Sequence, residues 1–390
     1  AGFFAAINIA LNNSKLKIII LERGSEGLQK VKISGGGRCN VTHAEYIPSD
    51  LCSKYPRGKK ELLGPFHQFM TGDTIKWFQE RGIELKTEKD GRIFPISNNS
   101  QTIIDCFLSE VKKYKIQVLY NHSVKSIEKQ KDSWLLKTND KKFNSTKLLV
   151  ATGSNRNMWN LLEKLNHKII KPVPSLFSFN INDDRISSIP GITINDVEIK
   201  VVNSKLNSNG PLLITHKGLS APSILKLSAF GALEFASLDH KFSIEINFLK
   251  ISNQECFEKL KTFKINLSRK MVVKLSPFGI PIRLWKELVV YSKIETTTTW
   301  ADLNNHQLKA LSNQLTSAVF NVTGKSTFKE EFVTAGGVDL KEINFKSFES
   351  KIHKNLFFAG EILNIDAVTG GFNFQNAWTG AFIAAKSISS

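Results

Sequence analysis

The sequence is poor in cysteine and arginine, and it has no long hydrophobic run. Its four cysteines are scattered, without a CxxC pair or a His/Cys cluster at zinc spacing, so we expect neither a redox-active disulfide nor a structural metal. No stretch of about 18 uncharged apolar residues occurs, and we therefore expect no membrane-spanning helix. Scattered cysteines without a membrane segment predict a reducing, cytoplasmic location.

Positive charge is in excess, with a formal net charge of +18. Nearly all of it comes from lysine, because the chain holds only nine arginines. The lysines are spread among many Asn and Ile residues, whereas nucleic-acid modules usually cluster arginine and aromatic side chains on one face. On this composition we do not expect a nucleic-acid partner, although the charge would steer anionic substrates toward the protein.

The most informative stretch lies near the C-terminus. A short apolar strand at 356–359 ends on Gly360-Glu361, and Gly370-Gly371-Phe372-Asn373 then opens a helix of small and apolar residues. The N-terminus of a helix presents unpaired N–H groups and a positive dipole end, which suits a ligand that becomes negatively charged, such as a reduced flavin. An ordinary strand-to-helix turn is the alternative.

The beginning of the chain reads as the later part of a nucleotide-binding βαβ unit. A compact helix at 1–11 precedes a strand at 17–23 that carries Glu22 and Arg23 at its end. In such units the third glycine of GxGxxG packs helix on strand, and an acid about 20 residues later binds a ribose hydroxyl. Gly2 and Glu22 have this spacing, so we expect the first strand and the first two glycines upstream of this sequence. A plain helix–strand start is the alternative.

A glycine-rich segment follows that strand. It reads Ser34-Gly35-Gly36-Gly37-Arg38-Cys39-Asn40, and its glycines would let backbone N–H groups approach a phosphate or a ring closely. Arg38 adds a fixed positive charge. The next stretch, 45–65, is polar and contains proline, and we expect it to be a surface excursion. A buried strand at 147–150 later ends in Ala151-Thr152-Gly153.

Taken in order, Glu22, SGGGRCN, ATG and GGFN resemble the BaiN/YhiN-like flavoproteins, often described as aminoacetone-oxidase-family FAD-binding enzymes. GRIFP at 91–95 and VTAGGV at 333–338 also match, so the resemblance spans nearly the whole chain. It implies an α/β fold with a Rossmann-like, glutathione-reductase-like FAD-binding domain. An insert made of a β-barrel-like lobe and a helical subdomain interrupts that domain. The expected parts are 1–175 and 331–390 for the FAD-binding domain, 176–330 for the insert or substrate domain, and about 253–320 for its helical subdomain.

The motifs and the resemblance together imply a set of FAD contacts. Backbone N–H groups at 370–373 would face the flavin C2 oxygen, Glu361 would hold the ribityl or phosphate part, and the backbone of Val124 would touch adenine. Asp366 is a further possibility, with loop capping as its alternative. The expected cofactor-binding residues are Gly2, Glu22, Arg23, Ser34, Gly35, Gly36, Arg38, Val124, Thr152, Gly153, Gly360, Glu361, Gly370, Gly371, Phe372 and Asn373.

Catalytic residues are harder to assign. Cys39 follows the glycine loop, where a cysteine with a lowered pKa would attack a substrate as the thiolate or protonate it as the thiol. A buried structural cysteine explains it better. His216 lies in a turn of the insert. There it would contact the substrate or donate a proton, and the alternative is a histidine that is simply exposed. No other residue stands out as an acid or base.

These observations predict an FAD-dependent oxidoreductase. It would pass hydride between a reductant, flavin N5 and an unsaturated or carbonyl organic substrate, possibly a hydrophobic small molecule. No second GxGxxG occurs, so NAD(P)H would bind transiently beside the flavin without a nucleotide-binding domain of its own. The alternatives are an RNA-modifying flavoprotein that uses its basic surface, and a non-catalytic flavin-binding protein.

Overall fold

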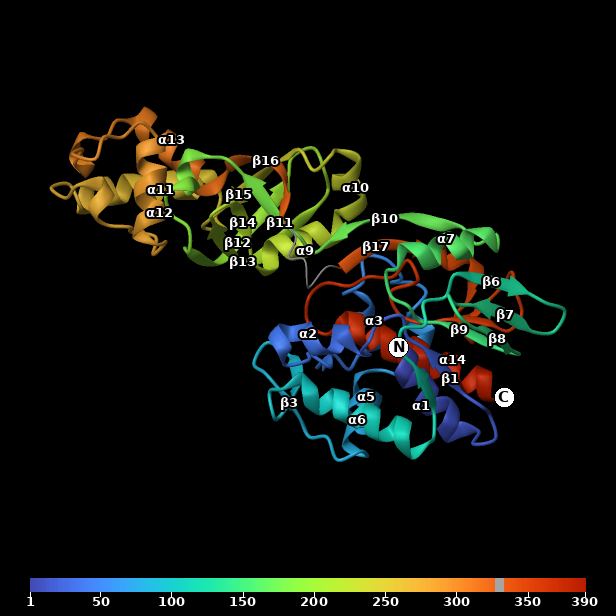
Figure 1. Cartoon of the computed structure of the whole chain (residues 1–390). Coiled ribbons are helices and arrows are strands. Elements are labelled where there is room, and N and C mark those ends of the chain that lie inside the picture. Colours follow the sequence, from blue (N-terminus) through green and yellow to red (C-terminus); the bar gives the residue numbers. More distant parts are fainter. Residues whose placement is uncertain (327–332) are drawn as a thin grey trace. The chain divides into compact units, whose positions relative to one another are not determined.

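The computed structural model describes residues 1–326 and 333–390 (Figure 1). The chain divides into two compact units. The first unit combines Ala1–Val173 with Val333–Ser390, and the second begins at Pro174. The boundary expected between residues 330 and 331 lies outside the described residues.

Two pairs of parallel strands form the framework of the first unit. Strand β1 (Ile19–Leu21) pairs with β5 (Gln117–Leu119), and β9 (Leu148–Val150) pairs with β20 (Leu356–Phe358). Parallel strands place their carboxyl ends at one edge, where α/β proteins bind ligands. The motifs that follow β1, β9 and β20 are therefore candidates for one common site.

Helices α1 (Gly2–Asn12) and α14 (Phe372–Ser389) lie side by side in this unit (Figure 1). Both are rich in small residues, which allow their backbones to approach closely. Phe4 of α1 is fully buried and lies 5.2 Å from the ring of Trp378 on α14. The two ends of the sequence thus share one core.

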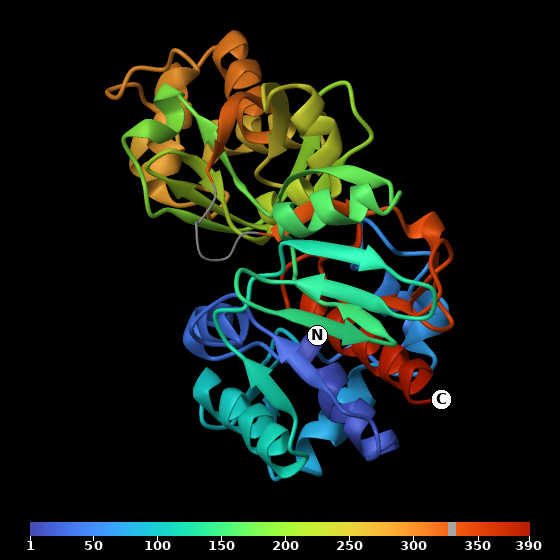
Figure 2. The ribbon, with the colours of Figure 1, turned by 45° about the vertical axis from the view of Figure 1, so that its right-hand side comes forward.

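Antiparallel strands and further helices complete the first unit, and Figure 2 shows its three-stranded sheet of β6, β7 and β8. The predictions missed β8, whose residues are mostly polar. The remaining elements are α2 (Gln29–Gly37), β2 (Thr42–His43), α3 (Pro48–Cys52), α4 (Leu63–Phe66), α5 (Thr71–Gln79), β3 (Leu85–Thr87), β4 (Arg92–Pro95), α6 (Ser100–Lys113), β6 (Ser126–Lys129), β7 (Trp134–Lys137), β8 (Lys142–Ser145), α7 (Arg156–Lys164), β10 (Ile169–Ser175), β17 (Val333–Val338), β18 (Ile343–Asn344) and β19 (Glu349–Ser350).

The stretch 45–65 is only partly the surface excursion that its composition suggested. Leu51, Tyr55 and Leu62 are at most 1% exposed, whereas Tyr46, Ile47 and Leu63 are between 42% and 56% exposed. The buried side chains are too far apart in sequence to form a periodic pattern. Two short helices and the turns between them nevertheless bring these side chains to one face. The buried part of the segment therefore belongs to the core beneath the start of α14.

The second unit contains a closed six-stranded barrel, which confirms the barrel-like lobe expected for the insert. Three short helices, α8 (Asp184–Ser187), α9 (Pro222–Phe230) and α10 (Ala232–Ser237), accompany it. Around the barrel the strands follow the order β11 (Ser178–Ile181), β14 (Gly218–Ser220), β13 (Asn207–Thr215), β12 (Thr193–Val201), β15 (Phe242–Asn247) and β16 (Ala318–Ser326).

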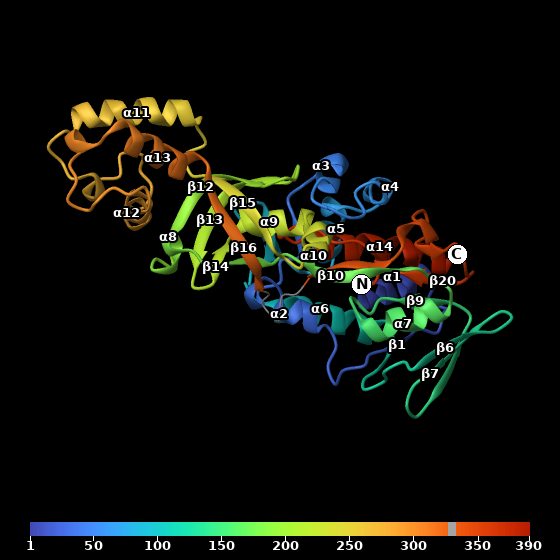
Figure 3. The ribbon, with the colours of Figure 1, turned by 90° about the horizontal axis from the view of Figure 1, so that it is seen from above.

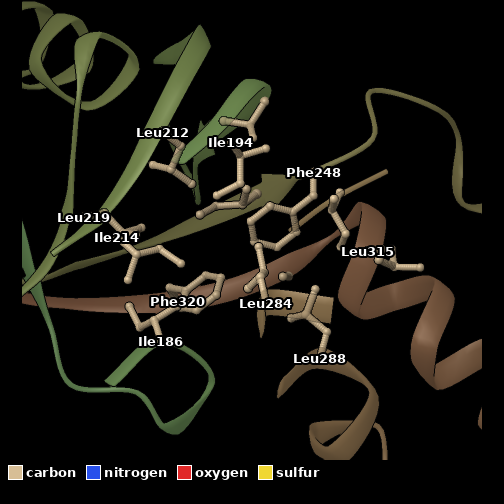
Figure 4. Packing of buried hydrophobic residues seen from close by; sticks show 14 of the residues in the cluster. Ile186, Ile194, Leu212, Ile214, Leu219, Phe248, Leu284, Leu288, Leu315 and Phe320 are labelled. Carbon is tan, nitrogen blue, oxygen red and sulfur yellow. The ribbon is translucent and has the colours of Figure 1, made fainter. Parts of the chain in front are cut away.

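Helices α11 (Asn253–Asn266), α12 (Ile282–Tyr291) and α13 (Asn305–Thr316) form the helical part of this unit (Figure 3). Figure 4 shows Leu284 and Leu288 of α12 beside Phe248 and Phe320, so helices and strands share a single core. The helical part ends at Thr316, before the expected residue 320. The reason is that burial alternates from Ala318 onward, as in a strand with one buried face.

Candidate functional site

The start of α14 is shaped by two glycines with positive φ, Gly370 at 131° and Gly371 at 92°. A Cβ atom on Gly371 would lie 2.6 Å from the carbonyl oxygen of Thr42 and 2.8 Å from Oδ1 of Asn40. Only glycine fits this position, because both the backbone angle and the space exclude a side chain. The segment that follows the glycine loop therefore lies directly against the N-terminus of α14.

The side chains next to these glycines are already engaged within the protein. Asn373 Oδ1 accepts a bond from the N–H of Ala367 at 3.0 Å. The Phe372 ring stacks on His43 with centroids 4.5 Å apart, and Tyr55 donates its hydroxyl to the Phe372 carbonyl at 2.6 Å. Asn373 and Phe372 thus shape the turn, while the N–H groups of the first helical turn remain the natural ligand contacts.

The glycine-rich segment departs from helical geometry at Ser34. Gly35, Gly36 and Gly37 all have positive φ, between 58° and 81°. A Cβ on Gly35 would meet the backbone nitrogen of Asn40 at 3.0 Å, whereas one on Gly36 or Gly37 would meet nothing within 4 Å. One side of this turn is packed and the other is open, so a ligand can approach its backbone.

Hydrogen bonds hold the glycine-rich segment to α14. The indole of Trp378 donates to the carbonyl of Val41 at 3.0 Å, and the hydroxyl of Thr42 donates to Oε1 of Gln375 at 2.6 Å. All of these groups are buried. The structure thus brings together the SGGGRCN and GGFN motifs, which stand more than 300 residues apart in the sequence.

Several buried polar atoms near these motifs have no hydrogen-bond partner within the described residues. Leaving such an atom unpaired costs about 1–3 kcal/mol, so each one marks a place where a polar ligand would be stabilised. Asn40 contributes one of them directly over Gly371. The atoms are Asn40 Oδ1, His43 Nδ1, Asn364 Oδ1, Asn376 Oδ1 and Asn376 Nδ2.

A second group of predicted residues meets where β9 and β20 end. A Cβ on Gly153, whose φ is 63°, would lie 3.9 Å from Oε2 of Glu361. Gly360 lies over α14, since its Cβ would be 3.6 Å from that of Ala377. Burial raises the pKa of Glu361 above its ordinary value, and the charge of nearby Lys30 opposes this shift.

The first helix reaches the same edge. A Cβ on Gly2 would lie 3.5 Å from the Cβ of Ala151, in the ATG turn. The neighbouring Thr152 is exposed. Gly2, the ATG turn and Gly360-Glu361 are therefore brought together at the carboxyl end of the parallel strands.

Glu22 stands at the end of β1, beside the chain that leads to Val124. Its Oε1 accepts a bond from the N–H of Gly24 at 2.8 Å, and its carbonyl accepts one from His122 at 2.8 Å. Val124 is partly buried and precedes β6, while Arg23 is exposed. The residues assigned to the adenosine part thus share one neighbourhood.

Arg38 and Cys39 have neighbours that the sequence did not reveal. The Arg38 guanidinium donates to Glu88 at 2.7 Å and lies 4.0 Å from the ring centre of Phe94. Cys39 is fully buried, and burial raises the pKa of its thiol to about 12. A thiol with this pKa is protonated at neutral pH, which favours the structural interpretation of Cys39 over a thiolate nucleophile.

His216 belongs to the second unit, in the turn between β13 and β14. Its side chain is exposed there. Among the described residues, no hydrogen bond of the His216 ring is found, so the second unit gives it no polar partner for a catalytic role. The geometry of the first unit therefore supplies the cofactor candidates, and His216 stays a prediction.

The sequence reasoning missed one ion pair next to the site. The Arg57 guanidinium donates to both carboxylate oxygens of Asp366, whose side chain is fully buried. The N–H of Val368 also donates to the carbonyl of Lys54 at 3.0 Å. These bonds join two distant loops just before Gly370. Arg57 lies within the stretch expected to be a surface excursion, and for this reason the sequence did not predict its ion pair with Asp366.

Within residues 1–326 and 333–390, no group of three or more His, Cys, Asp or Glu side chains could hold a metal ion. Over the same residues, no helix is both long and apolar enough to cross a membrane.

Known proteins resemble this chain along its whole length. Ribosomal RNA dihydrouridine synthase of Haemophilus influenzae is 28% identical over 408 residues, covering 100% of this chain and 96% of the relative. The Escherichia coli protein of the same name is 25% identical and covers 95% of this chain and 92% of the relative. The 3-dehydro-bile acid delta(4,6)-reductase of Clostridium scindens is 22% identical, covering 99% and 96%.

A solved structure supports the fold. The 3-ketosteroid-delta4-(5alpha)-dehydrogenase from Rhodococcus jostii matches with a TM-score of 0.54 at 11% identity, covering 100% of this chain and 94% of that chain. The family model described as HI0933-like protein Rossmann domain matches residues 1–387, which confirms the expected fold class. The chain therefore belongs to the HI0933-like Rossmann-domain family, the BaiN/YhiN-type family of FAD-dependent oxidoreductases.

Proposed function

We propose that the first unit binds FAD along the edge formed by Glu22, the glycine-rich segment, the ATG turn and the start of α14. The observation that carries this proposal is the position of Gly371, where the backbone of Thr42 and the unpartnered Oδ1 of Asn40 crowd a helix N-terminus. The backbone at Gly36 and Gly37 is open on one side and offers a second place where a ligand could bind. Both features suit a ligand with phosphates and a polar ring.

The chain's own groups would act by position and electrostatics. N–H groups of the first turn of α14 would stabilise negative charge on the isoalloxazine, because they lie at the positive end of the helix. The Arg57–Asp366 pair would hold the loop before Gly370 in place. Bound FAD supplies hydride transfer at its N5 atom, with NAD(P)H as the proposed electron donor.

The proposed reaction is the reduction of a carbon–carbon double bond conjugated to a carbonyl group. The names of the relatives support this, because the C5–C6 bond of uracil and the Δ4 bond of a 3-oxo steroid share that chemistry. We propose a uridine of ribosomal RNA as the substrate, since two relatives with that named activity match nearly the whole chain. The net charge of +18 fits a polyanion, although composition alone did not lead us to expect one.

A hydrophobic enone is the second candidate substrate. It is favoured by the bile-acid reductase, which matches at the lower identity of 22%. A non-catalytic role would be supported if neither substrate reoxidised the reduced flavin.

The deciding experiment follows the visible absorption of the FAD-loaded protein under anaerobic conditions. NADPH should bleach the flavin bands, and unmodified ribosomal RNA transcribed in vitro should restore them. Mass spectrometry of the digested RNA should then show a uridine that has gained two hydrogens. Recovery of the bands with a 3-oxo-Δ4-steroid but not with RNA would establish the second substrate instead, and absence of any flavin bands after FAD addition would refute the proposal.

A further inference from the structure

The segment from the second half of α11 to the start of α12 carries an unusual concentration of positive charge. From residue 259 to residue 286 the sequence contains no Asp or Glu. No other stretch of this chain combines so many cations with a complete absence of acids. Its eight cations are Lys259, Lys261, Lys264, Arg269, Lys270, Lys274, Arg283 and Lys286.

Half of these cations are engaged within the protein. Lys259 and Lys261 form ion pairs within α11, and Lys264 and Arg283 donate to backbone carbonyl groups. The other four are exposed, and no ion pair or side-chain hydrogen bond is found for them among the described residues. These four, Arg269, Lys270, Lys274 and Lys286, are called the basic tip below.

The backbone beneath the basic tip is well ordered by hydrogen bonds. The N–H groups of Trp300 and Ala301 donate to the carbonyls of Lys270 and Ser268, both at 3.0 Å. The indole of the fully buried Trp285 donates to the carbonyl of Val272 at 2.8 Å. A surface held in this way loses little conformational entropy when it binds a partner.

The basic tip lies at one end of its unit. Figures 1 and 3 both show the α11–α12 connection at the end of the helical part away from the barrel strands. The acids beside the tip include Glu287, which follows Lys286 and is partly buried. The exposed Glu295 and Asp302 lie on the segment that runs beside residues 268–272. Asp302 already accepts a hydrogen bond from the hydroxyl of Thr299. The potential at the tip is therefore positive.

We propose that the basic tip binds the phosphate backbone of ribosomal RNA and so holds the substrate on the protein. This inference rests on the proposed RNA substrate and adds the surface that recognises it. Four cations without an ion-pair partner among the described residues, on an ordered platform, match a polyanion. Three of the four are lysines, so the scarcity of clustered arginine does not argue against this surface.

An anionic membrane is the competing partner. Exposed apolar residues do lie near the tip, and they come from different elements. They are Ile265 at 76%, Met271 at 42%, Leu275 at 39% and Ile282 at 49% exposure. However, the apolar face of α11, including Cys256 and Leu260, is buried against neighbouring elements, so the helix has no continuous apolar face to insert into lipid. The structure therefore favours RNA.

The test compares two variants with equal changes of charge. The first is R269Q/K270Q/K274Q/K286Q, and the matched control is K205Q/K217Q/K226Q/K241Q, which changes four exposed lysines of the barrel part. Fluorescence anisotropy measures binding to unmodified ribosomal RNA transcribed in vitro, over a series of salt concentrations. The tip variant should bind roughly 30-fold or more weakly, with a salt dependence reduced by about three in log–log slope, since each phosphate contact contributes about 0.7–0.9.

Three outcomes separate the possibilities. Loss of RNA binding in the tip variant alone supports the proposal, whether or not the RNA is later found to be reduced. Equal losses in both variants, or none in either, would overturn it, because binding would then depend on total charge or on another surface. Loss of binding to vesicles containing phosphatidylglycerol, with RNA binding intact, would assign the tip to membranes. An unchanged denaturation midpoint of the tip variant, together with unchanged flavin content, excludes misfolding as the cause.

Discussion

His167 illustrates how a buried polar residue serves the fold without serving catalysis. Its Nδ1 bonds Glu342 at 2.7 Å, and its Nε2 lies 3.1 Å from Oγ of Ser350. This order of Ser, His and Glu is the one found in hydrolases. Here, however, Ser350 Oγ also accepts the N–H groups of Ile352 and His353, so its lone pairs are engaged. The cluster therefore joins three segments and is no nucleophilic site.

The lowered pKa of His167 leads us to expect that the protein loses stability in acid. Burial lowers the pKa of His167, His353 adds to this shift, and Glu342 opposes it. A histidine whose pKa is lower in the folded state binds protons preferentially in the unfolded state, so the free energy of unfolding falls as the pH drops below about 6.5. Urea unfolding at a series of pH values should show this fall in the natural protein.

The variant His167→Gln provides the control for that prediction. It should be less stable at neutral pH but show a smaller pH dependence between about pH 7.5 and pH 5.5. His43 and His240 also have lowered pKa values because of burial, so some dependence will remain. Identical pH slopes for the natural protein and the variant would show that His167 does not contribute.

Gly371 supports a prediction about the cofactor. In Gly371→Ala the new Cβ would lie 2.6 Å from the carbonyl of Thr42 at a φ of 92°, and such strain costs about 1–3 kcal/mol. We expect FAD binding to weaken at least tenfold, because the backbone must shift where the flavin would lie. The control is Gly72→Ala, since a Cβ there meets nothing within 4 Å. Equal flavin-to-protein ratios in the two variants would contradict the prediction.

At the scale of elements, Arg185 joins three parts of the second unit. It follows Asp183 at the start of α8 and bonds both of its carboxylate oxygens. Its remaining donors reach Gln314 on α13 at 2.7 Å and the carbonyl of Val319 on β16. The guanidinium also lies 3.8 Å from the ring centre of Phe320. A helix, a strand and a short turn are thus held by one side chain.

Replacing this side chain should be costly. Arg185 is 3% exposed, and Arg185→Met would leave Asp183 without its partner, so we expect a loss of about 3–5 kcal/mol in the free energy of unfolding. Chemical denaturation monitored by tryptophan fluorescence measures the change. The exposed Arg283→Met serves as control and should change stability by less than about 0.5 kcal/mol. Similar losses in the two variants would argue against the role assigned to Arg185.

At the scale of the whole molecule, the proposed cofactor site joins segments that are distant in the sequence. Hydrogen exchange with added FAD should slow at three segments of the first unit together, namely 35–43, 151–154 and 361–376. The reason is that their backbones share one edge, as the distances at Gly371 and Gly153 show. Slowing at only one of the three would mean that the edge does not bind the cofactor as a unit.

Much of this organisation could be predicted from local sequence. The glycine motifs and the strands that precede them follow from periodicity and turn residues, and the resemblance to a known family predicted the barrel-like lobe. The buried residues of 45–65 and the strand that begins at Ala318 could not. Short elements produce weak patterns in 45–65, and in both places burial depends on distant partners. The same limit explains why Arg57 escaped notice.

The sequence by itself determined the family, the class of fold and the motifs that suit FAD, because these depend on residues close together along the chain. Only the tertiary structure decided which side chains are free. It gave Arg38 and Asp366 partners within the protein, and it buried Cys39. It also left four cations of the α11–α12 region without an ion-pair partner among the described residues. Partnership and burial arise from contacts between distant segments, and no local pattern encodes them.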